Sequence, residues 1–103
     1  MPEITKEQIE EWKKKYGRVR KLSVNEIDYY YRPLDLDEYY SVQEVANATE
    51  GNSDAVGQEQ VIRLGVLSPV LAEKIPAGVT IKLSDEILRL SGFVSDEIKP
   101  EEL

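Results

Sequence analysis

The chain of 103 residues contains no cysteine and no histidine. Without cysteine it has no disulfide, no zinc–thiolate site and no thiol nucleophile. Without histidine it lacks the side chain that most often moves protons near neutral pH and most often ligates transition metals. Catalysis by carboxylates, lysine or tyrosine would need strongly shifted pKa values. We therefore expect no enzyme, and no catalytic, cofactor-binding or metal site.

Long apolar runs and an excess of basic charge are also missing. No stretch approaches the roughly 20 apolar residues that span a bilayer, and the N-terminal MPEITKEQIEE is too acidic and polar for a signal peptide. The net charge is −7, whereas nucleic-acid-binding proteins normally present a basic face. We therefore expect a cytoplasmic protein that binds neither membranes nor nucleic acids.

The basic residues that are present gather in one run. We interpret this run as a solvated helix face followed by a strand edge, rather than as a nucleic-acid contact, and it comprises Lys13, Lys14, Lys15, Arg18, Arg20 and Lys21. The acidic group Asp35, Asp37 and Glu38 resembles a metal cluster, but negative charge is also favoured where a helix begins. Helix capping is the better explanation for it.

The length allows one small domain, because two cores would each be too small to be stable. We expect a globular domain over residues 1–95 and a charged, frayed tail over residues 96–103. The predicted fold class is α+β, with three to four helices packed on one two-stranded antiparallel hairpin. No internal repeat or low-complexity tract interrupts the domain.

Local signals place the first helix and the hairpin. Thr5 and Gln8 have the spacing of a capping box, and Gly17 suits a left-handed C-terminal position, so we expect a helix over residues 5–16. Its apolar stripe is Ile9, Trp12 and Tyr16. The next segment, RVRKLSVNEIDYYYRP, alternates like two paired strands around a turn at Asn25-Glu26.

The rest of the chain favours helices. Asp35 and Glu38 predict a capped helix to about Ala48, and a third helix is expected from about Ala55 to Leu64. We expect the second helix to bury Leu36, Tyr39, Val42, Val45 and Ala46. Prolines interrupt the segment that follows, so a short helical turn is expected at residues 69–74 before a last helix at roughly 80–91.

Five of the six tyrosines fall within DYYYRPLDLDEYY, residues 28–40. The predicted strand and helix faces place Tyr29, Tyr31 and Tyr39 in the core. The same faces leave Tyr30, Arg32 and Tyr40 as candidate partner-binding residues, because tyrosine and arginine are enriched among residues that dominate interfaces. Two alternatives stay open for Tyr30 and Arg32: a docking surface, or a face covered by another part of the chain. The free edge of the hairpin is a further candidate surface for an added strand, with the alternative that Lys21 and Arg32 discourage such pairing.

Four stretches together resemble the tail assembly chaperones of tailed phages, particularly the baseplate hub assembly chaperone group. They are EEWKKKYGRVRKLSV at 10–24, YYYRPLDLDEYYSVQ at 29–43, QVIRLGVLSP at 60–69 and IPAGVTIKLSDEILRLSGF at 75–93. The segment TEGNSDAVGQ is shorter and more polar than the corresponding segment of that group. Gly65 and Ser68 also stand where bulkier residues are expected.

The resemblance implies a non-enzymatic protein that acts in phage morphogenesis. Its client would be a tape-measure or baseplate hub protein, and it would work in the cytoplasm of the infected bacterium. Two alternatives remain: a structural subunit retained in the tail or baseplate of the virion, and a small acidic adaptor or inhibitor directed at a host protein. The group has no active site whose residues could be carried over.

Overall fold

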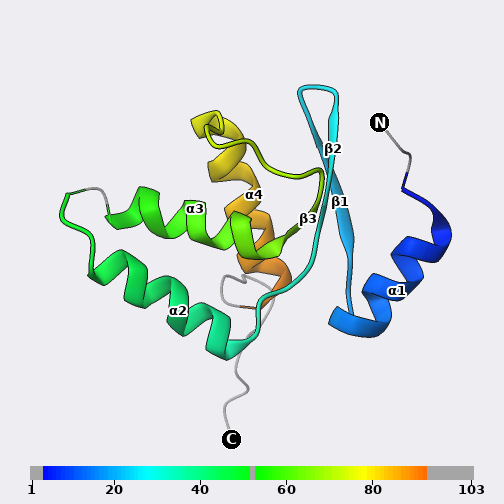
Figure 1. Cartoon of the computed structure of the whole chain (residues 1–103), viewed down its shortest axis with the longest axis horizontal. Coiled ribbons are helices and arrows are strands. Elements are labelled where there is room, and N and C mark those ends of the chain that lie inside the picture. Colours follow the sequence, from blue (N-terminus) through cyan, green and yellow to red (C-terminus); the bar gives the residue numbers. More distant parts are fainter. Residues whose placement is uncertain (1–3, 52, 93–103) are drawn as a thin grey trace, which may run out of the picture.

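The computed structural model describes residues 4–51 and 53–92, which form four helices and one three-stranded sheet (Figure 1). The expected α+β class is confirmed, with one strand more than the predicted hairpin. The predicted tail at 96–103 lies outside the described residues. In chain order the elements are α1 (Lys6–Tyr16), β1 (Arg20–Val24), β2 (Ile27–Tyr31), α2 (Leu36–Asn47), α3 (Ser53–Gly65), β3 (Val66–Ser68) and α4 (Ala77–Leu90).

The hairpin forms in the predicted register. Strands β1 and β2 pair antiparallel, with Val24 opposite Ile27 and Leu22 opposite Tyr29. Asn25 and Glu26 make the two-residue turn, with φ of 53° and 67°. Two consecutive positive φ values define a type I′ turn, whose twist matches that of the strands. The turn therefore sets which side chains face the core.

The third strand was not predicted. Strand β3 follows α3 directly and pairs antiparallel with β2 through a register irregularity at Tyr30 and Tyr31. The helical turn expected at residues 69–74 is wrong, because that segment is irregular. Its backbone bonds to α3 instead: the guanidinium of Arg63 donates to the carbonyl oxygens of Ala72 (3.3 Å) and Glu73 (3.1 Å).

The core lies between one face of the sheet and the helices α2, α3 and α4. The most completely buried side chains are Ile62 of α3 and Leu83 and Ile87 of α4. Helices α3 and α4 approach closely at Gly65, where an added Cβ would lie 2.8 Å from Cδ1 of Ile87. Packing, and not the φ angle, therefore favours glycine at this position, since a larger residue would force Ile87 to shift.

Helix α2 begins as predicted but buries less than predicted. The carboxylate of Asp35 accepts from the backbone N–H of Glu38 (2.8 Å), and the carboxylate of Glu38 accepts from the backbone N–H of Asp35 (3.1 Å). Val42 is buried, whereas Leu36 and Val45 of the expected stripe are exposed. The helix packs mainly on α3, so only a narrow strip of its surface is covered.

Helix α1 lies apart from the other helices (Figure 1). The hydroxyl of Thr5 accepts from the backbone N–H of Gln8 (3.1 Å), and Gly17 has φ of 86°, so both predicted ends are confirmed. None of its residues is fully buried, and the stripe of Ile9, Trp12 and Tyr16 is half-covered. Because its stripe is half-covered, α1 contributes little to the main core.

Candidate partner-binding surfaces

Tyr30 is covered by α1. Its ring lies tilted against that of Trp12, with 6.0 Å between the centroids, and its side chain is half-buried. Such tilted pairs of aromatic rings are stabilising beyond the area they bury. Of the two alternatives for this face of the hairpin, the structure therefore has the second, in which another part of the same chain covers it.

Arg32 is buried, with 8% of its surface exposed, so for this residue too the structure has the alternative in which another part of the chain covers it. Its Nη1 and Nη2 donate to the two carboxylate oxygens of Glu38 at 2.6 and 2.7 Å. The backbone N–H of Arg32 donates to the carbonyl of Gly65 (2.9 Å). The guanidinium also stacks over the ring of Tyr16, 4.5 Å from its centroid. Arg32 thus connects β2 with α1, α2 and α3.

Electrostatics stabilise the charged form of this pair. Hydrogen bonding from Arg32 is the main cause that lowers the pKa of Glu38; burial opposes it by raising the pKa, and the backbone N–H of Asp35 lowers the pKa further. The hydrogen bond to Glu38 likewise raises the pKa of Arg32. Parallel N–H···O bonds between a guanidinium and a carboxylate are among the stronger interactions in proteins. The arrangement is that of a structural clamp.

Tyr40 remains available for contact. It is 53% exposed on α2, and Leu36, one turn earlier, is 55% exposed. Residues four apart lie next to each other on a helix surface. The two side chains therefore form a small apolar patch on the outer face of α2, and the role of Tyr40 in partner binding stays a prediction.

The hairpin tip borders an apolar groove that sequence patterns did not indicate. One wall carries Ile27 and Tyr29 of β2, and the other carries the segment between β3 and α4. Val70 in that segment is 97% exposed and Ile27 is 44% exposed. We call this surface the tip groove, and its volume is about 260 Å³. It is lined by Asn25, Ile27, Tyr29, Pro69, Val70, Leu71, Ala72, Lys74, Ile75, Pro76 and Val79.

Sequence reasoning missed the tip groove for two local reasons. Ile27 was assigned to the core face, and it does point to that face, but it lies beside the turn where the core ends. Val70 was assigned to a helical turn that does not form. The one available signal was the string VLSPVLAEKIPAG, which has too many apolar residues for an ordinary solvent loop.

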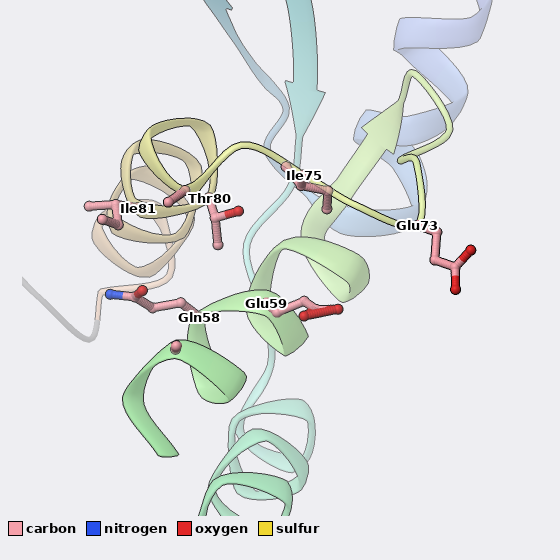
Figure 2. A pocket seen from close by; sticks show the side chains of 8 residues that line it. Gln58, Glu59, Glu73, Ile75, Thr80 and Ile81 are labelled. Carbon is pink, nitrogen blue, oxygen red and sulfur yellow. The ribbon is translucent and has the colours of Figure 1, made fainter. Parts of the chain in front are cut away.

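A second cavity lies between α3 and α4 (Figure 2). Gln58 and Glu59 come from α3, Thr80 and Ile81 from α4, and Glu73 and Ile75 from the connecting segment. Its volume is about 270 Å³. Glu59 is already bonded to Nε of Arg63 at 3.0 Å, which fixes it along α3. The lining therefore offers a small mixed surface.

The described residues contain neither a group of metal ligands nor a membrane-spanning helix. Among residues 4–51 and 53–92, no three acidic residues cluster closely enough to hold a metal ion. None of the helices in this part of the chain is both long and apolar enough to cross a bilayer. Comparisons with protein-family models, with curated proteins and with solved structures find no match to this chain.

Proposed function

We propose that this chain is a non-enzymatic assembly protein of a tailed phage, which binds a tape-measure or baseplate hub protein as a chaperone. The observation that carries the proposal is the tip groove, with Val70 almost fully exposed at its rim. Exposed apolar surface of this kind is typical of a binding site for another protein. The class of client comes from the resemblance of the sequence to the baseplate hub assembly chaperone group.

The tip groove has the chemistry for an apolar client segment. Its walls are formed mostly by aliphatic side chains and proline, while Lys74 is the charged residue that lines it. An apolar segment with a neighbouring acidic residue would bury Val70 and place its carboxylate beside Lys74. Burying a valine side chain contributes roughly 1.5 kcal/mol, about a tenfold change in affinity.

The segment that carries Val70 is held in place before any client binds. Arg63 bonds two of its carbonyl oxygens, and Arg63 is itself positioned by Glu59 one turn earlier in α3. A preorganised wall loses less conformational entropy on binding than a free loop. The acidic net charge of −7 would keep both chaperone and client soluble.

Affinity capture of the tagged protein from phage-infected cells tests the proposal. Mass spectrometry of the eluate should identify a tape-measure or hub protein, and purified virions should lack this chain. The variant Val70→Glu should lower the amount of captured client roughly tenfold, since a charge then lies in the apolar contact. Ile81→Glu is the matched control, because Ile81 is 53% exposed on α4 but does not line the tip groove.

Other results of this capture experiment would indicate a different function or a different binding surface. Presence in virions at fixed stoichiometry would make the chain a structural subunit of the tail or baseplate. Capture of host proteins without any phage protein would contradict the proposed class and favour a host-directed adaptor or inhibitor. Equal capture by wild type and Val70→Glu would mean that the client binds away from the tip groove.

A further inference from the structure

The outer edge of β1 is open. The sheet order is β1-β2-β3, so in the part of the chain that the structure describes, β1 has a neighbour on one side only. In a two-residue hairpin the pair flanking the turn is hydrogen-bonded, and bonded pairs alternate from there. Arg20, Leu22 and Val24 therefore direct their backbone groups to β2, while Lys21 and Ser23 direct theirs outward. Within residues 4–51 and 53–92, those outward groups have no hydrogen-bond partner.

Basic side chains surround this edge in a chain that is acidic overall. Arg18, Arg20 and Lys21 are exposed on or before β1. The last turn of α1, which leads into the strand, adds the exposed Lys13, Lys14 and Lys15. Figure 1 shows the last turn of α1 close to the start of β1. The open edge and the basic run therefore coincide in one region of a protein with net charge −7.

The two faces of the edge differ in chemistry. Lys21 and Ser23 are on the face that α1 covers, and both are exposed. Leu22 lies on the core face, where it is only partly buried. A strand added beside β1 would alternate its side chains between these faces. It would meet Lys21 and Ser23 on one face, and Leu22 together with the exposed Arg20 on the other.

We propose that the β1 edge binds an extended segment of a protein partner in which acidic and apolar residues alternate. The backbone of that segment bonds to Lys21 and Ser23, its acidic side chains lie toward Lys21 and the α1 lysines, and its apolar side chains pack beside Leu22. Strand addition of this kind takes affinity from backbone bonds and selectivity from the alternating side chains.

A second copy of the chain fits this edge less well. Pairing two β1 edges would bring two basic runs together, and like charges across neighbouring strands are destabilising. The same lysines and arginines that oppose self-association favour an acidic strand. This edge and the tip groove are different surfaces, so the inference does not depend on the proposed client.

The test uses the full-length protein and a soluble peptide of about eight residues in which glutamate and valine alternate. Titration followed by amide hydrogen exchange should show binding together with new protection of the Lys21 and Ser23 amides. A peptide that alternates lysine and valine is the charge control and should not bind. In a glutamate–valine peptide with N-methyl groups on alternate residues, one edge of the peptide can no longer pair with β1, although its charge is unchanged. Weaker binding of this peptide would show that strand pairing, and not charge attraction alone, holds the segment.

Two variants locate the contact. Lys21→Pro removes an outward N–H without removing a bond to β2, and proline is tolerated at edge strands; binding should be lost. Lys21→Glu should weaken binding, with a change of roughly threefold to tenfold in affinity for the loss and reversal of one charge. Lys82 is exposed on α4, away from this region, so the Lys82→Glu variant should bind the glutamate–valine peptide like wild type.

Three results would overturn the inference: no binding of the glutamate–valine peptide, binding unchanged in Lys21→Pro, or a wild-type dimer that Lys21→Pro dissociates. Capture from infected cells distinguishes this inference from the proposed function. If a tail protein is captured but the peptide does not bind, the edge inference alone fails. If the peptide protects Lys21 and Ser23 but no tail protein is captured, the proposed function alone fails.

Discussion

The clamp between Arg32 and Glu38 makes a quantitative prediction about stability. Replacing Glu38→Gln keeps the shape of the side chain and an oxygen that can still accept from the backbone N–H of Asp35. The variant removes the negative charge that faces Arg32, whose side chain is 10% exposed. The guanidinium would then be a buried charge with a neutral partner.

The expected loss is about 2–3 kcal/mol in the free energy of unfolding. Removing one partner of a fully buried pair costs about 3–5 kcal/mol, whereas exposed pairs contribute about 0–1 kcal/mol. Glu38 is 24% exposed, so solvent screens part of the interaction. A domain of this size has a stability of roughly 5–10 kcal/mol, so the loss would be a large fraction of it.

Urea denaturation at pH 7, followed by circular dichroism, measures this loss. Glu59→Gln is the matched control, because Glu59 pairs with Arg63 one turn away but is 51% exposed. The control should lose less than about 1 kcal/mol. Arg32→Met and the double variant complete a cycle that isolates the pair. A Glu38→Gln variant within about 0.5 kcal/mol of wild type would refute the argument that burial makes this pair strong.

The same pair predicts a pH dependence. The pKa of Glu38 is lowered in the folded protein, mainly by hydrogen bonds from Arg32. The folded state therefore binds fewer protons at this group than the unfolded chain does. The stabilisation is fully present above the ordinary carboxyl pKa of about 4.3 and is lost as the pH falls through the lowered value. The difference between wild type and Glu38→Gln should shrink below about pH 4.

Three other substitutions test the packing and the turn. Gly65→Ala should cost about 1–3 kcal/mol in urea denaturation, because the new methyl group would meet Ile87 at 2.8 Å. Glu26→Gly should stabilise the protein by up to about 1 kcal/mol, since the φ of 67° at Glu26 suits glycine better than glutamate. An unchanged midpoint of urea denaturation would contradict the type I′ turn. Trp12→Ala should cost less than the roughly 3–5 kcal/mol of a buried tryptophan, and should increase hydrogen exchange in α1 before the core.

Local chemistry explains why much of the fold was predictable. The caps at Thr5 and Asp35 and the turn at Asn25-Glu26 each depend on residues within a few positions of one another. Once the turn sets the register, the alternation of side chains determines which tyrosines face the core. The predicted burial of Tyr29 and Tyr31 is confirmed for that reason.

The errors come from contacts between residues far apart in the sequence. Strand β3 has three residues, too few for an alternating pattern, and forms only because β2 offers an edge. Nothing near Arg32 in the sequence distinguishes a solvated arginine from one that is clamped by Glu38 and covered by Tyr16 of another helix. Leu36 looked buried because α2 is amphipathic, but among the described elements α2 packs mainly on α3 and Leu36 stays exposed.

The two proposed surfaces follow from the position of the hairpin at the margin of the core. The hairpin turn extends beyond the helices that cover its core face, which leaves Ile27 exposed beside the segment that carries Val70. Its other face is covered by α1, which has no buried residue, and within residues 4–51 and 53–92 no strand pairs with the outer edge of β1. A helix held through Trp12 and Tyr16 can shift at lower cost than one in the core. A strand that binds at the β1 edge should therefore change the exchange of α1 as well as that of Lys21 and Ser23, whereas a segment bound in the tip groove should leave α1 unchanged.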